Sequence, residues 1–223
     1  MTRLVLHQHP FAQYCQKVLI AFGELGLPFE SRLVEGRGEL ARLWPPASIP
    51  VLVDEEAGVM LPESSAIIEY LDGLGGGGLV PGVQARLWDR ICDHHVADQV
   101  GKVVTDQLRP DDGHDSVGVE QARQKLDTAY GVLETQLARD RWLAGDTFTI
   151  ADCSAASALF YAWVVHRWQP DAHPSLTRYY GDVMARPSVH EVIEAARPYR
   201  EVFPLPWPED ADAHRPGDLP PQR

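Results

Sequence analysis

The sequence contains no asparagine and only three cysteines, Cys15, Cys92 and Cys153, among its 223 residues. Without asparagine, no acceptor for N-linked glycosylation exists. Three widely spaced cysteines give neither a disulfide framework nor the ligand spacing of a zinc site. Cations are also scarce, with 20 Lys and Arg against 32 Asp and Glu and a net charge of −12. Because so acidic a chain repels phosphate groups, we expect no nucleic-acid partner and no membrane partner.

Long hydrophobic runs are missing as well. The longest apolar stretch covers residues 155–165, whereas a membrane helix needs roughly 20 apolar residues. Residues 1–7 lack the apolar core of a secretory signal peptide. With 44% hydrophobic and 23% charged residues, the composition is typical of one large or two small globular domains. We therefore expect a cytoplasmic protein.

The first third of the chain alternates between two periodicities. Short apolar runs predict strands, and runs with helical spacing predict helices, in the order strand 4–6, helix 18–27, strand 29–34, a weak helix, strand 50–53, strand 59–61 and helix 64–74. A strand–helix–strand unit followed by a hairpin and a closing helix gives a small mixed sheet with helices on its faces. We therefore predict an α/β domain over residues 1–76.

The hydrophobic pattern of the rest of the chain predicts helices. A run of four glycines at 75–78 interrupts the pattern, and we predict a linker over residues 77–83. The periodic segments that follow all have helical spacing and lie at 85–108, 119–137, 150–168, 175–184 and 189–196. These predict an all-α domain over residues 84–203. The proline-rich, acidic stretch 204–223 is predicted to be a loose tail.

Two segments of the first domain carry polar chemistry. Ser64 or Ser65 stands at the N-cap position of the helix 64–74, whose first-turn N–H groups can hold an anion. The neighbouring Glu63 could accept an ammonium group, so the pair suits an α-amino acid zwitterion. A second segment, Ile49-Pro50, precedes a strand and is compatible with a cis peptide bond, although most X–Pro bonds are trans.

One motif of the second domain has a structural meaning. Thr149 and Asp152 have the spacing of a helix capping box, with Asp in place of the usual Glu. Asp93, His94, His95 and Asp98 lie close together, but no third metal ligand follows at a defined spacing. We therefore predict a solvated or interdomain face there, and no metal site.

Taken in order, these segments resemble the cytosolic glutathione transferases over residues 3–200. The resemblance rests on matching segments along the whole chain, namely 26–30, 49–52, 63–67, 79–81, 144–146 and Asp152. It implies a thioredoxin-like N-terminal domain, an all-helical C-terminal domain and a homodimer. It also implies glutathione as co-substrate, with no metal. Residue by residue, Ile49 beside a cis-Pro50 would meet the cysteinyl backbone of glutathione, while Ser64 and Glu63 would hold its γ-glutamyl end.

The catalytic segment departs from the family pattern. Aligning Lys17-Val18 with the family's basic–apolar pair puts Ala12 at the usual Ser or Cys position, and alanine has no side-chain donor. A subgroup of bacterial transferases looks like this segment, so we favour that register. A rival register puts His9 at the nucleophile position. The first-turn N–H groups, Gln13 and Cys15 remain as other candidates for stabilising the glutathione thiolate. Tyr14 could belong equally to the core or to the site.

The resemblance implies a glutathione transferase that activates the thiolate for attack on a small hydrophobic electrophile, a detoxification reaction. The electrophile would lie between the domains, against the helix predicted over 85–108. Two alternatives stay open. Ala12 fits a transferase-like binding or regulatory protein that has lost catalysis, and Cys15 fits a glutathione-dependent thiol–disulfide reductase.

Overall fold

The computed structural model describes residues 3–34, 36–208 and 211. Four strands form a mixed sheet in the order β2-β1-β3-β4, with bounds β1 Leu4–Gln8, β2 Glu30–Leu33, β3 Val51–Asp54 and β4 Val59–Leu61. Strand β1 runs parallel to β2 and antiparallel to β3, and β3 forms a hairpin with β4. Leu4 and Leu6 lie on one face of β1 and join the hydrophobic core, while Val5 between them is also buried, on the other face.

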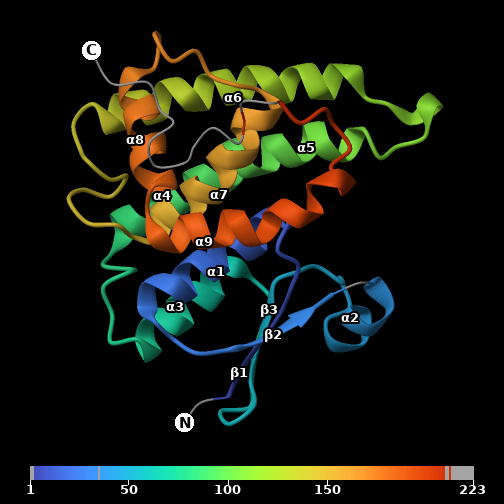
Figure 1. Ribbon diagram of the computed structural model, residues 1–223, viewed down its shortest axis with the longest axis vertical. Coiled ribbons are helices and arrows are strands. Elements are labelled where there is room, and N and C mark those ends of the chain that lie inside the picture. The colour runs from blue at the N-terminus through green and yellow to red at the C-terminus, as the bar shows by residue number, and fades with distance from the viewer. Residues whose placement is uncertain (1–2, 35, 209–210, 212–223) are drawn as a thin grey trace.

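Two helices pack on the core side of this sheet (Figure 1). They are α1 Gln13–Leu25 and α3 Ser64–Leu74, whereas the short α2 Arg37–Leu43 stands apart from both. Gly26 ends α1 with φ of 62°, a left-handed conformation that favours glycine. Helix α1 begins at Gln13 rather than at the predicted residue 18. The apolar pattern missed its first turns because Gln16 and Lys17 are fully buried although both are polar.

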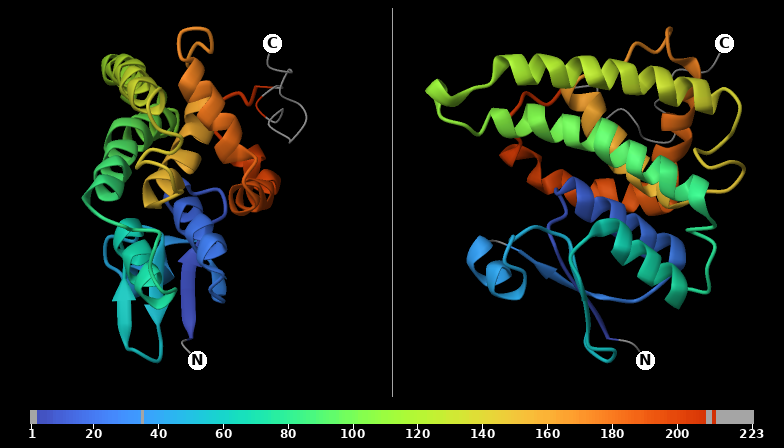
Figure 2. Two further views of the ribbon diagram at one scale, coloured as in Figure 1. Left: turned by 90° about the vertical axis from the view of Figure 1, so that its left-hand side faces the viewer. Right: turned by 180° about the vertical axis from the view of Figure 1, so that it is seen from behind.

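The second half of the chain is all helical, which confirms the predicted fold class. Its helices are α4 Val83–Ile91, α5 Asp98–Asp106, α6 Ser116–Leu137, α7 Ile150–Val165, α8 Pro174–Met184 and α9 Pro187–Ala196, with short 3-10 turns η2 Asp111–Gly113 and η3 Arg197–Val202. A π-helical turn, η1 Cys92–Ala97, joins α4 to α5. Figure 2 shows α6 as the long helix farthest from the sheet. No helix within the described residues has both the length and the apolar character to cross a bilayer.

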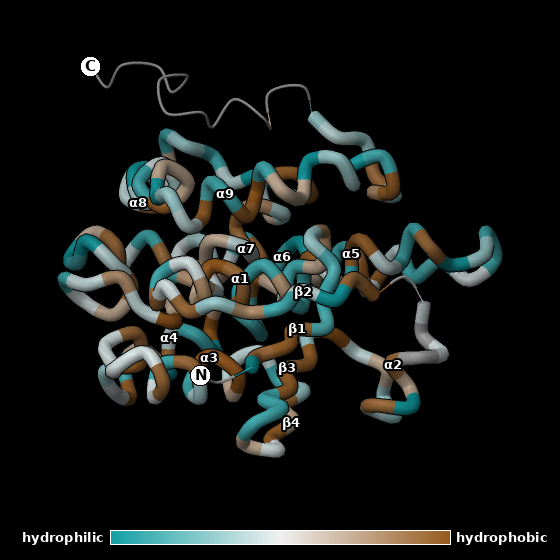
Figure 3. The backbone as a smooth tube through the Cα atoms, turned by 60° about the horizontal axis from the view of Figure 1, so that its bottom comes forward, coloured by the Kyte–Doolittle hydropathy of each residue, from teal (hydrophilic) through white to brown (hydrophobic). Residues whose placement is uncertain are grey.

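Helix α7 is the centre of the helical domain. Every residue from Ile150 to Ala162 is buried, and Figure 3 places the helix in the middle of the molecule, with α8 and α9 to one side. The predicted capping box at its start is confirmed, with the Thr149 N–H donating to Asp152 Oδ2 over 2.8 Å. The N–H of Ile150 also donates to Leu79 O over 2.8 Å, which ties the linker to α7.

The beginning of the predicted tail is packed. Trp207 lies 6.0 Å from Phe11 and 5.7 Å from Phe160 between ring centroids. Phe203, the residue just before the predicted tail, lies 5.8 Å from Phe11. Apolar aromatic contacts therefore hold these first residues on the loop between β1 and α1, where a loose tail was expected. Residues 209–210 and 212–223 of that tail lie outside the described part of the chain.

An ion pair joins the two halves. Arg186 Nε, just before α9, donates to Glu24 Oε1 of α1 over 2.7 Å, and the Ser188 hydroxyl donates to the same oxygen. Although burial opposes ionisation, the hydrogen bonds from Arg186 and Ser188 lower the pKa of Glu24. A carboxyl with a lowered folded pKa stabilises the fold above its unfolded pKa, and that contribution is lost as pH falls through the folded value.

Glu24→Gln is therefore expected to lower the free energy of unfolding by about 1–2 kcal/mol near neutral pH. Between neutral pH and about pH 3, the variant should lose less stability than the wild type, because it no longer binds the extra proton on unfolding. Urea denaturation across this pH range is the measurement. Glu191→Gln, an exposed carboxylate on α9, is the matched control, and equal pH slopes for Glu24→Gln and the wild type would contradict the prediction.

Candidate functional site

A cavity of about 290 Å³ lies between the first domain and the α4–η1–α5 segment. The four residues that the sequence predicted for ligand binding, Ile49, Pro50, Glu63 and Ser64, all line it. The other lining residues come from both domains and are Tyr14, Ser48, Pro62, Arg90, Asp93, His94 and Asp98. The structure thus brings the predicted binding residues together and adds a polar wall from the second domain.

The edge of the cavity beside β3 is formed by a bent backbone. The Ile49–Pro50 peptide bond is cis, as expected. Pro50 is buried and immediately precedes Val51, the first residue of β3. Proline has no N–H and is tolerated at the start of a strand. The Ile49 backbone is therefore held at the cavity wall by the sheet behind it.

The start of α3 forms a second wall. Glu63, rather than Ser64 or Ser65, occupies the N-cap position, with φ −112° and ψ 126° and no side-chain capping bond. The predicted serine cap is therefore wrong by one or two residues. Ser64 is the first helical residue and is 7% exposed. Since no side chain caps this helix, its first-turn N–H groups are available to an anion.

A buried charge cluster lies next to the start of α3. Lys17 Nζ, fully buried, lies 2.6 Å from Asp89 Oδ1 and 2.8 Å from Asp93 Oδ2, and it donates to Ser65 Oγ over 2.7 Å. Burial raises the pKa of Asp93, and the nearby Asp89 adds to the rise. Burial opposes the ionisation of Asp89, but Lys17, the Ser154 hydroxyl and Arg90 together lower the pKa of that carboxyl. Arg90 closes the cluster on the cavity side, 2.8 Å from Asp89.

A hydrogen-bonded chain lines the opposite wall. The Tyr14 hydroxyl donates to Asp98 Oδ1 over 2.6 Å, and His94 Nδ1 lies 3.1 Å from Asp98 Oδ2. Burial raises the pKa of Tyr14, and the bond to Asp98 adds to this rise, so the phenol stays protonated at neutral pH. Across the described residues, no group of three or more His, Cys, Asp or Glu side chains is arranged to share a metal ion.

The predicted catalytic candidates lie elsewhere. Ala12 is the N-cap of α1 and provides no side-chain cap. Cys15 is fully buried, and burial raises the pKa of its thiol to about 12. His9 Nδ1 accepts the Phe11 N–H over 3.2 Å, and burial lowers the pKa of its ring. Gln13 Nε2 is buried and has no hydrogen-bond partner among the described residues.

None of these four side chains is among the described residues that line the cavity, whereas Tyr14 is. Sequence reasoning left Tyr14 open between core and site and assigned His94 and Asp98 to a solvated or interdomain face. Their i,i+4 spacing was the one available signal, since such residues share a helix face.

Comparisons with known proteins agree with this architecture. A model of the glutathione S-transferase N-terminal domain matches residues 6–77, and one of the C-terminal domain matches residues 116–182. Glutathione S-transferase GstB of Escherichia coli K12 is 26% identical over 204 residues, covering 80% of this chain and 91% of the relative.

Two solved structures are similar over most of their length. A glutathione S-transferase from Methylobacterium radiotolerans, in complex with glutathione sulfonate, is 28% identical with a TM-score of 0.75 and covers 86% of this chain and 95% of that chain. One from Methylobacillus flagellatus with glutathione bound is 25% identical with a TM-score of 0.77 and covers 85% and 98%. The resemblance found in the sequence is thereby confirmed, and the chain belongs to the glutathione S-transferase family.

Proposed function

We propose that the protein binds glutathione in the 290 Å³ cavity and presents its thiolate to a small hydrophobic electrophile. The observation that carries the proposal is the convergence of Ile49, Pro50, Glu63 and Ser64 on this one cavity. The similar structures that contain glutathione or its sulfonate support the choice of ligand.

The two ends of the cavity match the chemistry of a γ-linked tripeptide. The α-carboxylate of the γ-glutamyl group would lie at the uncapped start of α3, beside Ser64 and Arg90, and its ammonium group would meet Glu63. The cysteinyl backbone would run along Ile49, next to the cis peptide bond. This arrangement pairs both charges of the γ-glutamyl group with an opposite charge or a helix N-terminus.

The start of α1 is a source of stabilisation for the thiolate. Ala12 leaves this helix N-terminus without a side-chain cap, and the Cys15 N–H donates to Ala12 O, so the N–H groups of Gln13 and Tyr14 remain to interact with an anion. A helix N-terminus lowers the pKa of a thiol that lies near it. Proximity of the bound thiolate to the electrophile would supply much of the remaining rate enhancement.

Calorimetric titration with reduced glutathione tests the binding site. The wild type is expected to bind, and Glu63→Gln is expected to bind about tenfold more weakly or worse, because a charge-assisted hydrogen bond contributes about 1.5–3 kcal/mol. Glu69→Gln is the control, since Glu69 lies on α3 but pairs with Arg86 at the surface. Absence of binding heat at millimolar glutathione would sink the proposal.

Turnover separates the enzyme from its alternatives. Conjugation of 1-chloro-2,4-dinitrobenzene supports the transferase, whereas glutathione binding without turnover of a broad panel of electrophiles supports the binding protein that Ala12 suggests. A reductase using Cys15 is not favoured, because a fully buried thiol with its pKa raised to about 12 is a poor nucleophile. Cys15→Ser should accordingly leave activity unchanged.

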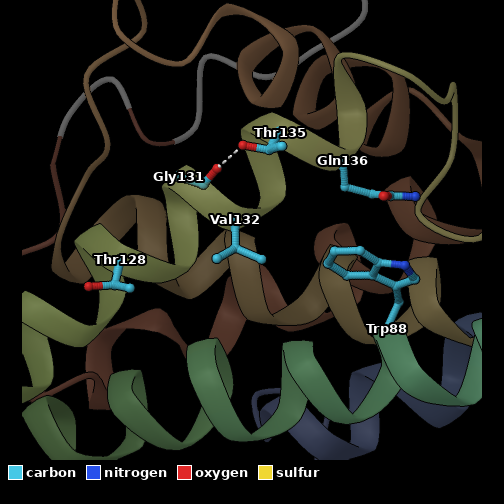
Figure 4. Close-up of a pocket in the computed structure, with 6 residues that line it drawn as sticks. All are labelled: Trp88, Thr128, Gly131, Val132, Thr135 and Gln136. Atoms are coloured by element: carbon cyan, nitrogen blue, oxygen red, sulfur yellow. Dashed lines mark hydrogen bonds between the residues drawn. The ribbon is translucent and has the colours of Figure 1, made fainter.

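We also propose that two copies of the chain pair through α4 and α6. Exposed apolar side chains flank this face, with Leu87 48% and Val132 44% exposed. A second cavity of about 360 Å³ lies between the helices, and Figure 4 shows Trp88 of α4 facing the α6 residues that line it. Sedimentation equilibrium measures this association.

The cytoplasmic location of the protein stays a prediction.

A further inference from the structure

Tyr14, Asp98 and His94 form a hydrogen-bonded series of side chains. None of the three was among the residues expected to be catalytic. We propose that His94 is the general base that takes the proton from the glutathione thiol, with Asp98 and Tyr14 as the residues that position it. The inference rests on the proposed function, and it supplies a group that activates the thiol where Ala12 has no functional side chain.

The hydrogen bonds fix the roles of the two imidazole nitrogens. A carboxylate only accepts hydrogen bonds, so His94 Nδ1, 3.1 Å from Asp98 Oδ2, is the donor. The neutral ring then carries its lone pair on Nε2, where a proton can be accepted. The His94 side chain is 59% exposed and lines the cavity, so Nε2 is accessible to a bound ligand. An imidazole oriented by a carboxylate is a recurring arrangement for proton abstraction.

Asp98 is itself held in place from the other domain. Its second oxygen, Oδ1, accepts the Tyr14 hydroxyl over 2.6 Å. Tyr14 lies two residues after Ala12, in the first turn of α1, so this bond holds Asp98 beside the helix start where the proposed function places the thiol. Tyr14 is unsuited to be the base, because burial raises the pKa of its phenol and its proton is already donated to Asp98.

The backbone around His94 is unusual in a way that serves this placement. Residues 92–97 form a π-helical turn, and the Asp98 N–H donates to Asp93 O, five residues back. Neighbouring residues in an α-helix point about 100° apart. Here Asp93 reaches the buried Lys17 and also lines the cavity beside His94. Such π-turns within helices are frequent at functional sites.

Asp98 is the charged group in contact with His94. The titratable and charged groups that line it with His94 are Tyr14 of α1, Glu63 before α3, Arg90 of α4, Asp93 of η1 and Asp98 of α5. Asp93 is already paired with Lys17 and Arg90, whereas Asp98 is in contact with the His94 ring. The neighbouring Asp98 carboxylate stabilises the imidazolium that forms when the thiol loses its proton.

His94 Nε2 accepts the proton of the glutathione S–H bond, and the bonding electron pair remains on sulfur as the thiolate. With 1-chloro-2,4-dinitrobenzene, the thiolate forms a C–S bond to the ring carbon, and chloride leaves with the electrons of the C–Cl bond. The imidazolium then returns its proton to water.

The test compares His94→Gln with His95→Gln, whose exposed ring is next in sequence and is not among the lining residues of the cavity. His94→Gln is expected to lower kcat at neutral pH on the order of a hundredfold, with KM for glutathione within about twofold of the wild type, since Gln removes only the base. The deficit should shrink above about pH 8.5, where thiols ionise unaided. His95→Gln should match the wild type throughout.

Asp98→Asn supplies a second readout. It is expected to lower kcat less than His94→Gln and to move the acidic limb of the pH profile to lower pH, because the imidazolium loses its neighbouring carboxylate. Calorimetry with reduced glutathione on the same proteins separates the two levels of inference. Wild-type kcat and pH profile in a His94→Gln protein that still binds glutathione would overturn the role of His94 alone. Absence of binding in the wild type would overturn the proposed function and this inference with it.

Discussion

Replacing Lys17 with methionine is expected to lower the free energy of unfolding by about 3–5 kcal/mol, the range for removing one partner of a buried ion pair. Lys17 is the cation within 2.8 Å of both Asp89 and Asp93, and all three residues are buried. Methionine fills a similar volume but leaves two carboxylates out of water with Arg90 as their remaining cation, on the cavity side. Urea denaturation followed by circular dichroism measures the loss.

Two comparisons separate the lost charge from lost packing. Lys125→Met replaces an exposed lysine of α6 and should change stability by less than about 0.5 kcal/mol. Adding Asp93→Asn to Lys17→Met should recover part of the loss, because one unpaired carboxylate is removed. The single variant should also regain stability as pH falls, since protonation of Asp93 relieves the buried charge. A loss of unfolding free energy below about 1 kcal/mol would show that the buried charge cluster contributes little to stability.

The burial of Lys17 also explains why the start of α1 could not be predicted from the sequence. Apolar periodicity located the strands and most helices, because their buried faces are built from Leu, Ile and Val with regular spacing. It placed the start of α1 five residues late, at 18 instead of Gln13. Lys17 and Gln16 look like surface residues in a pattern, and only their partners on other elements, such as Asp89 and Tyr161, make their burial favourable.

The residues of the candidate site also differ in whether the sequence alone could predict them. Glu63 and Ser64 were found because their chemistry is local, at a helix N-terminus, whereas Pro50 was assigned to the site by the family resemblance. Tyr14, His94 and Asp98 were not, because their meaning arises from contacts across 84 residues of sequence, as in the bond from Tyr14 to Asp98. A pair at i,i+4 shows which helix face two residues share, but the packing of the domains decides what that face meets.

Asp152→Ala is the second change expected to have a large effect, with a loss of at least about 3 kcal/mol of unfolding free energy. The fully buried Asp152 accepts four hydrogen bonds, from Thr149 N and Oγ1 over 2.8 and 3.1 Å, Leu143 N over 3.1 Å and the Tyr179 hydroxyl over 2.7 Å. Removing the acceptor leaves the buried donors of three residues without a partner. Each unsatisfied donor costs about 1–3 kcal/mol.

The controls rank the contributions to this network. Thr149→Ala removes one side of the capping box and should cost about 0.5–2 kcal/mol. Tyr179→Phe removes one donor without leaving Asp152 unpaired, so it should cost about 1 kcal/mol. Because α7 packs against α1 as well as against its own domain, Asp152→Ala should lower the thermal transition of the whole chain. An Asp152→Ala loss no larger than that of Thr149→Ala would show that the network beyond the capping box adds nothing to stability.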